Sequence, residues 1–243
     1  MPVPENQRTA AVLVAAGQST RLRTTPEGPR KPFLVLEGLT VLEHAARAFD
    51  AVEAVVELVL VGNAADLARL TQLASHSPHL KKVSSIVPGG ELRTDSVRAG
   101  VAAIRPDLAL VAIHDAARPL ITPYTIERAI ALAAERGAAV VAVPVVDTIK
   151  TSSDGKHAQS TLDRSVLWSA QTPQIFRVAQ FKELLERARA EGYRPTDDAA
   201  LYERFVGGVP ICEGDPSNLK ITTPSDVQLA SQLLRARRER ERS

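Results

Sequence analysis

The chain has 243 residues, of which 44% are hydrophobic. A chain of this length and composition can bury the core of one large globular domain without covalent staples. Its formal net charge is only +2, which argues against a nucleic-acid-binding protein, and no apolar run approaches the roughly 20 residues that a membrane span needs. The single cysteine, Cys212, excludes an intrachain disulfide and favours a reducing, cytoplasmic compartment.

Short apolar runs alternate with helical patterns as far as residue 143. The apolar runs predict buried strands at residues 9–15, 55–62, 83–87, 108–113 and 138–143. The helical patterns cover residues 41–49, 64–74, 94–104 and 123–136. Apolar strands that alternate with helices indicate a parallel sheet covered on both faces. We therefore predict a Rossmann-like, doubly wound α/β fold with a mostly parallel sheet, in which ligands bind at the carboxyl ends of the strands.

The alternation breaks at residues 147–165, which are polar and contain the turn signal Asp154-Gly155. We expect a β-arm that protrudes from a single domain at about residues 147–167, although a plain surface loop would give the same pattern. Helices are expected at residues 178–191, 197–205 and 224–238, and strands at 209–213 and 219–222. The arginine-rich end of the last helix is typical of a solvated helix terminus, with a phosphate-binding tail as the alternative.

The first predicted strand runs into a loop of small residues, Ala15-Ala16-Gly17, with Arg21 shortly after it and Lys31 further on. Small residues let the backbone approach a ligand closely, and successive backbone N–H groups can hold a phosphate. The loop matches neither G-x-G-x-x-G nor G-x-x-x-x-G-K-[ST], so the dinucleotide and Walker-type fingerprints are absent. On its own it could equally be a tight structural turn.

The fourth predicted strand ends in His114-Asp115-Ala116-Ala117-Arg118-Pro119. A carboxylate at the carboxyl end of a strand is well placed for Mg²⁺, which prefers oxygen ligands and substrate phosphates. A structural Asp115–Arg118 ion pair is the alternative, and His114 is more typical of a packed core histidine than of a ligand. The histidines and the single cysteine show no zinc-site spacing, and without G-x-S-x-G a serine hydrolase is not expected.

Taken in order, these segments and several further polar clusters resemble the 2-C-methyl-D-erythritol 4-phosphate cytidylyltransferase family of the non-mevalonate isoprenoid pathway. The resemblance extends from about Thr9 to Leu234. Its most specific elements are His-Asp-Ala-Ala-Arg-Pro at residues 114–119, and Asp-Asp-Ala at 197–199 with Asn-Leu-Lys at 218–220. The other matching pieces are Ala15-Ala16-Gly17 with Arg21, Lys31, Gly89-Gly90 with Arg93 and Ser96, Asp147-Thr148-Ile149-Lys150, Leu162-Asp163-Arg164 with Trp168, and Gln171-Thr172-Pro173-Gln174.

The resemblance implies an enzyme that transfers the cytidylyl group of CTP to 2-C-methyl-D-erythritol 4-phosphate and releases pyrophosphate. It further implies a single nucleotidyltransferase domain over residues 1–243, a Mg²⁺ or other divalent cofactor, and a homodimer with exchanged arms. Nucleic acid and membrane are not expected as partners.

For the nucleotide side, the resemblance implies that the Gly17 backbone, Arg21 and Lys31 hold the triphosphate. Lys31 and Lys220 would stabilise charge at the α-phosphate. Asp115, with Ala116 beside it, would lie by the ribose and the metal. The remaining nucleotide-binding residues implied are Ala15, Ala16, Gly90 and Ser96, which include those that define the cytosine pocket.

For the acceptor side, the resemblance implies that Arg118, Thr148, Arg164 and Thr172 face the sugar phosphate. Arg164 and Thr172 would come from a neighbouring subunit. Asp215 is more typical of a turn residue before Pro216 than of a second carboxylate beside the metal.

Three alternatives stay open at this point. A ribitol-5-phosphate cytidylyltransferase shares the fold and many of these motifs. A catalytically silent nucleotide-binding protein is a second possibility, although such proteins typically lose the charged residues around the triphosphate, and Arg21, Lys31, Asp115 and Lys220 are all present here. A sugar-nucleotide pyrophosphorylase is the third.

Overall fold

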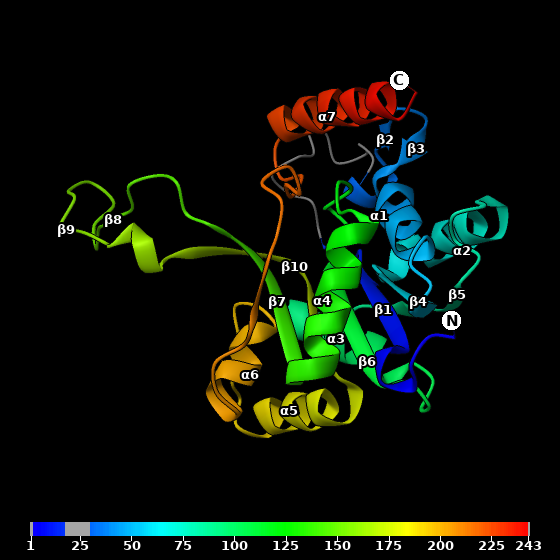
Figure 1. Ribbon diagram of the computed structural model, residues 1–243, viewed down its shortest axis with the longest axis horizontal. Helices are drawn as coiled ribbons and strands as arrows, with labels where there is room; N and C mark the ends of the chain where they lie inside the picture. The colour runs from blue at the N-terminus through cyan, green and yellow to red at the C-terminus, as the bar shows by residue number, and fades with distance from the viewer. Residues whose placement is uncertain (1, 18–29, 243) are drawn as a thin grey trace.

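The computed structural model describes residues 2–17 and 30–242, and its centre is a seven-stranded sheet in the order β11-β7-β10-β6-β1-β4-β5 (Figure 1). The strands are β1 (Thr9–Val14), β4 (Val55–Gly62), β5 (Val83–Pro88), β6 (Leu110–Asp115), β7 (Ala138–Pro144), β10 (Trp168–Arg177) and β11 (Ile211–Glu213). All neighbouring pairs are parallel except those that β10 makes with β6 and β7. The predicted α/β fold with a mostly parallel sheet is therefore confirmed.

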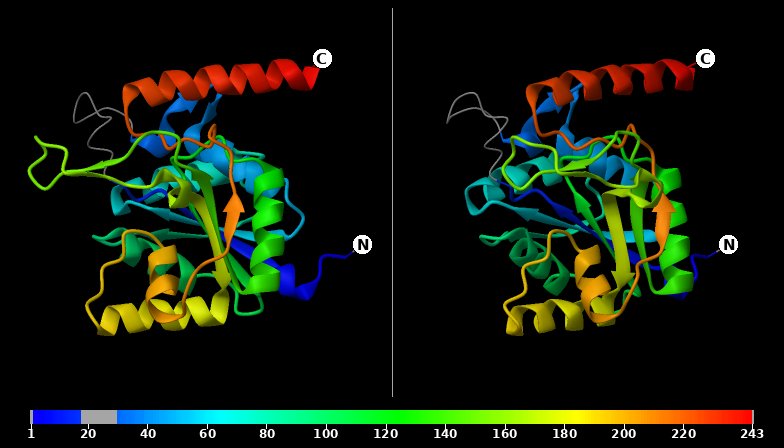
Figure 2. Two further views of the ribbon diagram at one scale, coloured as in Figure 1. Left: turned by 60° about the vertical axis from the view of Figure 1, so that its left-hand side comes forward. Right: turned by 90° about the vertical axis from the view of Figure 1, so that its left-hand side faces the viewer.

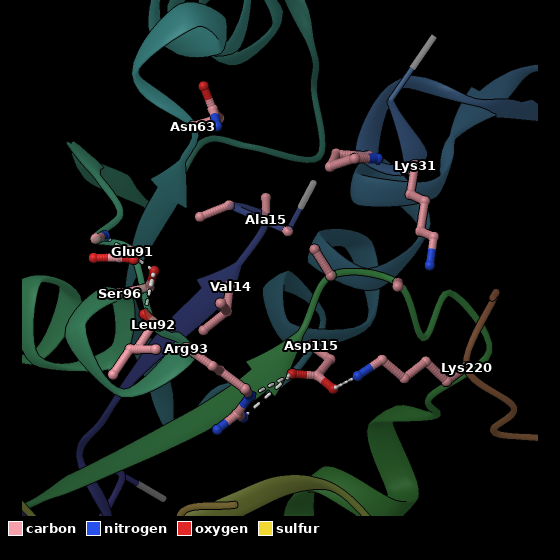
Figure 3. Close-up of a pocket in the computed structure, with 16 residues that line it drawn as sticks. Val14, Ala15, Lys31, Asn63, Glu91, Leu92, Arg93, Ser96, Asp115 and Lys220 are labelled. Atoms are coloured by element: carbon pink, nitrogen blue, oxygen red, sulfur yellow. Dashed lines mark hydrogen bonds and ion pairs between the residues drawn. The ribbon is translucent and has the colours of Figure 1, made fainter. Parts of the chain in front are cut away.

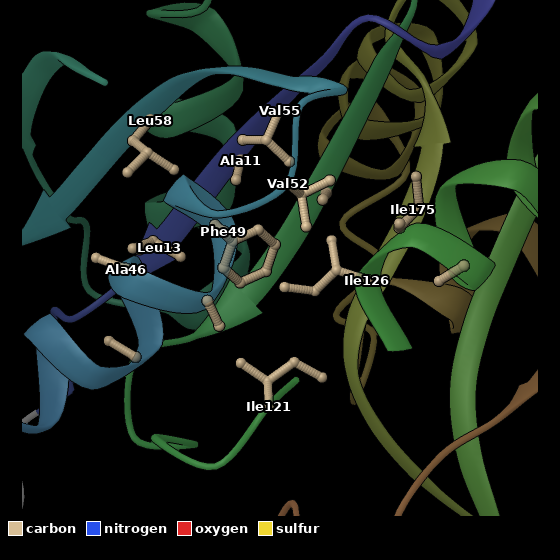
Figure 4. Packing of buried hydrophobic residues seen from close by; sticks show 14 of the residues in the cluster. Ala11, Leu13, Ala46, Phe49, Val52, Val55, Leu58, Ile121, Ile126 and Ile175 are labelled. Carbon is tan, nitrogen blue, oxygen red and sulfur yellow. The ribbon is translucent and has the colours of Figure 1, made fainter. Parts of the chain in front are cut away.

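Six α-helices from the described part of the chain cover the two faces of this sheet. One face carries α1 (Val41–Asp50), α2 (Leu67–His76) and α4 (Pro123–Arg136), and the other carries α3 (Arg93–Ala102), α5 (Val178–Ala190) and α6 (Ala199–Phe205). Side chains alternate along β1, so that Leu13 packs with Phe49 and Ile126 on the first face (Figure 4) while Val12 packs on the second. Burial on both faces explains why β1 is apolar from Ala10 to Val14.

Local sequence signals set the helix boundaries. Thr40 and Glu43 form a capping box at the start of α1. Thr122 caps α4, which has Pro123 in its first turn and ends at Gly137 with φ 92°. The predicted helices at 41–49, 123–136 and 178–191 therefore agree with the structure to within a residue or two.

The sequence patterns missed β10, the strand that runs antiparallel in the middle of the sheet. Its segment contains Gln171, Thr172 and Gln174, which are polar but almost completely buried. Buried polar groups need hydrogen-bond partners. The Gln174 amide donates to Asp197 Oδ2 at 2.8 Å and accepts from the Ala199 N–H at 2.7 Å. A buried strand whose polar groups are paired by tertiary contacts lacks the apolar or alternating pattern that predicts strands.

The segment 219–222 is a loop and not the predicted short strand. Its backbone is instead fixed by one tertiary hydrogen bond, from the Ile221 N–H to the Ala117 carbonyl at 2.8 Å. The loop leads into α7 (Pro224–Arg242), which packs with the small hairpin β2 (Val35–Leu36) and β3 (Leu39–Thr40) around Leu36, Leu120 and Ile221. Figure 2 shows α7 as a separate layer across one end of the sheet.

The segment between β7 and β10 leaves the body and extends well away from it (Figures 1 and 2). It contains the two-residue strands β8 (Lys150–Thr151) and β9 (Ser160–Thr161), which pair antiparallel, and a short 3-10 turn over Arg164–Val166. Apart from the exposed Val146, Leu162 and Val166, which are apolar, its side chains are mostly polar. We call residues 145–167 the arm.

Candidate active site

A cavity of about 530 Å³ opens at the carboxyl ends of the central strands (Figure 3). Its walls come from residues 14–17 at the end of β1, residues 31–32, Asn63 after β4, residues 90–93 and Ser96 after β5, residues 115–117 at the end of β6, and Lys220. Strands β4 and β6 flank β1 on opposite sides, so the cavity lies where the chain changes direction across the sheet. Open α/β sheets bind ligands at such switch points.

The cavity brings together most of the nucleotide-side residues that the sequence singled out. They are Ala15, Ala16, Gly17, Lys31, Gly90, Ser96, Asp115, Ala116 and Lys220. In Figure 3, Lys31 and Lys220 project from one side of the cavity, and Arg93 and Ser96 lie on the other. Arg21 lies outside the described residues.

Asp115 is the electrostatic centre of the cavity. Its Oδ2 accepts a hydrogen bond from Lys220 Nζ at 2.7 Å, and its Oδ1 accepts from Arg93 Nε and Nη2, both at 3.2 Å. Burial by itself would raise the pKa of the Asp115 carboxyl, but Arg93 and Lys220 outweigh it and hold that pKa well below its usual range. Asp115 is therefore a fixed negative charge at the end of β6.

Sequence reasoning quoted Arg93 as part of a motif but gave it no role in the site. The structure makes it a wall of the cavity, where it also pairs with Asp198 at 2.8 Å. The signal in the sequence is an arginine three residues after the glycine pair, at the start of a helix, where a cation is disfavoured by the helix dipole. Such a residue indicates an anionic partner elsewhere in the fold.

The glycine pair keeps the backbone of the cavity wall bare. A Cβ atom on Gly89 would lie 2.6 Å from Ser96 Oγ, and one on Gly90 would collide with Asp95. The Gly90 N–H donates to Ser96 Oγ at 3.2 Å, and Ser96 Oγ donates in turn to the Leu92 carbonyl at 3.3 Å. This corner therefore presents backbone groups and one buried hydroxyl to the cavity, a combination that can read the edge of a base.

His114 and Thr172 support Asp115 from beneath. Thr172 Oγ1 accepts from the Asp115 N–H at 3.1 Å and lies 3.0 Å from His114 Nδ1, while His114 Nε2 donates to the Arg118 carbonyl at 3.1 Å. Burial lowers the pKa of His114 to about 4, so its imidazole is neutral near pH 7. These bonds make His114 a packed core histidine, as the sequence favoured. Thr172 thus supports Asp115 of its own chain, a contact that the sequence did not predict.

Arg118 lies behind the loop that carries Lys220. Its Nη1 donates to the Asn218 carbonyl at 2.8 Å, and burial lowers the pKa of its guanidinium while Asp115 opposes that shift. Arg118 Nε and Asn218 Oδ1 are buried polar atoms that find no hydrogen-bond partner within the described part of the chain. Asn218 donates through Nδ2 to the Thr172 carbonyl at 3.0 Å. The Asp115–Arg118 ion pair considered from the sequence is replaced by pairs of Asp115 with Arg93 and Lys220.

Within one chain, the described cavity lining includes none of the four acceptor-side residues Arg118, Thr148, Arg164 and Thr172. Thr148 is exposed at the root of the arm, and Arg164, further out, donates to the Val146 carbonyl at 2.8 Å. Asp215 Oδ1 accepts from the Ser217 N–H at 2.7 Å, which is the geometry of a turn residue and agrees with the sequence interpretation.

The donor set suits a divalent cation that arrives with phosphates. The described residues contain no cluster of three or more acidic, histidine or cysteine side chains, so a metal held by protein groups alone is not built there. Asp115 supplies a deprotonated carboxylate to the cavity, and Mg²⁺ is usually bound through one or two carboxylates together with substrate phosphates and waters. In the same part of the chain, no helix is long and apolar enough to cross a membrane.

Comparisons with known proteins place the chain in one family. A family model described as 2-C-methyl-D-erythritol 4-phosphate cytidylyltransferase matches residues 9–236. Relatives of that name from Pelotomaculum thermopropionicum and Symbiobacterium thermophilum are 40% and 41% identical, and the alignments cover 96% and 93% of this chain and 97% and 92% of theirs.

Two solved structures share the fold. The 4-diphosphocytidyl-2C-methyl-D-erythritol synthase of Anaerococcus prevotii aligns with a TM-score of 0.81 at 27% identity, over 95% of this chain and 97% of that one. The 2-C-methyl-D-erythritol 4-phosphate cytidylyltransferase of Thermus thermophilus aligns with a TM-score of 0.73 at 30% identity, over 93% and 98%. The chain therefore belongs to the 2-C-methyl-D-erythritol 4-phosphate cytidylyltransferase family.

Proposed function

We propose that this protein transfers the cytidylyl group of CTP to 2-C-methyl-D-erythritol 4-phosphate in isoprenoid precursor biosynthesis. The products are 4-diphosphocytidyl-2-C-methyl-D-erythritol and pyrophosphate. The observation that carries the proposal is the cavity at the ends of β1 and β6, in which a bare glycine-containing backbone faces Lys31, Lys220 and the ionised Asp115. Family membership over residues 9–236 supports the same reaction.

The chemistry needs charge neutralisation more than it needs a base. A phosphate monoester has its second pKa near 6, so the acceptor is mostly a dianion at neutral pH and attacks the α-phosphorus directly. The new P–O bond forms as the bond to the pyrophosphate leaving group breaks, and no proton has to be removed. This agrees with a cavity lined by Lys31 and Lys220, next to which His114 is buried and neutral. Preorganised cations of this kind stabilise the transition state electrostatically.

For the nucleotide, we assign the base to the corner formed by Ala15, Gly90 and Ser96, where buried polar groups can discriminate cytosine from uracil. The triphosphate would follow the Ala16-Gly17 loop toward Lys31. Asp115, beside Ala116, would hold Mg²⁺ and face the ribose. When bound, Mg²⁺ would neutralise phosphate charge and orient the leaving group.

For the acceptor, we keep the four residues that the resemblance implies. Arg118 and Thr172 would act from the same chain, since Thr172 bonds to Asp115 there. Thr148 would come from the arm of a second copy together with Arg164, because both lie on the arm. A two-fold homodimer with exchanged arms would use each arm to complete the opposite site. Two features support this assignment: the arm extends away from its own body (Figure 1), and it exposes 77% of Val146 and 73% of Val166, apolar area that a partner would cover. We place the reaction in the cytoplasm, where the buried thiol of Cys212 would stay reduced.

An acceptor panel tests the proposal. With CTP and MgCl₂, 2-C-methyl-D-erythritol 4-phosphate should release pyrophosphate far faster than ribitol 5-phosphate or sugar 1-phosphates, and UTP should replace CTP poorly. Equal or faster release with ribitol 5-phosphate would favour the ribitol-5-phosphate cytidylyltransferase alternative, which the comparisons do not favour. No release with any acceptor would indicate a catalytically silent protein.

A further inference from the structure

Four charged side chains of alternating sign form a continuous chain along one wall of the cavity. Asp198 Oδ2 accepts from Arg93 Nη2 at 2.8 Å, Asp115 Oδ1 accepts from the same guanidinium at 3.2 Å, and Asp115 Oδ2 accepts from Lys220 Nζ at 2.7 Å. Figure 3 shows Arg93 and Lys220 on opposite sides of Asp115. The two oxygens of Asp115 therefore have different cationic partners.

The two ends of this chain differ in how firmly they are held. The Asp198 side chain is 2% exposed and that of Lys220 is 41% exposed. The segment that carries Asp198 is pinned to β10, because Gln174 bonds to both Asp197 and the Ala199 N–H. Lys220 lies on a loop and ends in the open cavity. Arg93 is thus anchored on its far side, whereas the Lys220 ammonium is held mainly by Asp115.

Asp198 does not itself reach the cavity, as it is absent from the lining residues that the structure describes. Burial disfavours the ionised form of Asp198 and raises the pKa of its carboxyl, and Arg93 only partly opposes that rise. A buried carboxylate is costly unless it is paired. Asp198 has such a partner in Arg93, at 2.8 Å, so each of the two side chains fixes the position of the other beside the cavity.

We propose that Asp198 and Arg93 are positioning residues that fix Oδ1 of Asp115, which leaves Oδ2 free to exchange Lys220 for the bound nucleotide and its metal. The inference rests on the proposed function. Arg93 faces the cavity, so without Asp198 it could turn toward the phosphates and release Asp115. With Asp198 in place, Lys220 can leave Asp115 for a phosphate while Asp115 keeps its orientation.

A double-mutant cycle between Asp198→Asn and Asp115→Asn tests this role. The measured quantities are the dissociation constant of CTP with MgCl₂, determined by titration calorimetry, and kcat. In the wild-type background, we expect Asp198→Asn to raise the dissociation constant of CTP about tenfold and to lower kcat about tenfold. A coupling of this size is within the range for charged neighbours in one network. In the Asp115→Asn background, Asp198→Asn should change either quantity less than twofold. The same factor in both backgrounds would overturn the inference, because a general structural defect does not depend on Asp115.

Glu191→Gln provides a matched control. Glu191 pairs with Arg187 and with Arg204 of α6, so this variant also removes one carboxylate from an arginine pair in the same region. It should bind CTP and turn over as the wild type does. If Asp198→Asn does not fold by circular dichroism, Arg93→Gln takes its place in the cycle. Failure of both to fold would assign the pair a structural role and overturn the inference.

The cycle separates this inference from the proposed function. A wild-type chain that binds CTP and turns over while the cycle is additive would contradict only the positioning role. A wild-type chain that does not bind CTP would overturn the proposed function, and this inference with it.

Discussion

Asp115 and Asp154 are two aspartates whose pKa values both lie well below the usual range, but the interactions that lower them differ. Asp115 is buried at the end of β6, where Arg93 and Lys220 overcome the cost of burial. Asp154 is exposed at the tip of the arm and is held by His157, by the backbone N–H groups of residues 156 and 157, and by Ser152. The low pKa of Asp115 depends in part on Lys220, which is 105 positions away in the sequence. The low pKa of Asp154 depends on its immediate neighbours in the sequence.

The same contrast distinguishes the cavity, a prebuilt region, from the arm, which is incomplete within one chain. The cavity is assembled by long-range contacts inside one chain and already holds its charged groups in hydrogen-bonding geometry. The arm is held by short-range turns, and nothing in the described residues fixes Thr148 or Arg164 against the cavity of the same chain. We therefore expect changes in the cavity to act within one subunit, and changes in the arm to act across two.

Removal of divalent metal should have the largest effect on the prebuilt region. Excess EDTA should abolish pyrophosphate release, because the proposed nucleotide site offers few anionic ligands besides Asp115 and the triphosphate charge needs a divalent ion. Adding MgCl₂ beyond the chelator should restore the rate, and EDTA already saturated with Mg²⁺ serves as the control. Persistent turnover in metal-free buffer would remove the metal from the mechanism.

Lys220→Ala should have the next largest effect on catalysis. We expect kcat to fall by about 10²–10³, by analogy with the loss of one preorganised donor to a charged transition state, with a smaller change in the dissociation constant of CTP. Steady-state kinetics and calorimetry measure the two quantities. Lys182→Ala, on α5 far from the cavity, is the control and should match the wild type. A kcat within threefold of wild type would exclude Lys220 from the chemistry.

Mixing Lys220→Ala with Arg164→Ala tests whether the two regions belong to different subunits. In a dimer with exchanged arms, refolding the two inactive variants together should restore roughly a quarter of normal activity, because half of the dimers are mixed and each has one intact site of two. If Arg164 serves its own chain, every site in a mixed dimer carries a lesion and mixing restores nothing. Light scattering supplies the second measurement, and a monomer at working concentration would contradict the dimer.

The smallest expected effect concerns stability at low pH. A folded-state pKa below the ordinary value of 3.8 means that the ionised carboxylate stabilises the fold above that pH, and that this contribution is lost as the pH falls through 3.8 toward the folded value. The gap in unfolding free energy between wild type and Asp115→Asn should therefore shrink between pH 6 and pH 3. For Asp154→Asn the same change should be much smaller, because solvent screens an exposed group. Urea titrations at each pH measure both gaps in unfolding free energy. If the two gaps changed equally with pH, the result would contradict the comparison.

The sequence by itself determined the strands that are apolar on both faces and the helices with clear caps. Val55–Gly62 and Pro123–Arg136 have the predicted boundaries because continuous apolar character and a Thr-Pro start are local signals. The position of Asp115 at the end of a predicted parallel strand also identified it as a candidate, since such strands carry their carboxyl ends to one edge of the sheet. Lys31 and Lys220 became candidates through the resemblance.

Only the tertiary structure decided β10 and the partners of each charge. Gln171 and Gln174 can lie in the middle of a sheet because Asn218 and Asp197, far away in the sequence, bond to them. No local pattern records such bonds. The same holds for Arg93, whose place between Asp115 and Asp198 depends on how α3, β6 and α6 pack. A charge takes its function from the groups that surround it when the chain is folded, and those groups are distant along the chain.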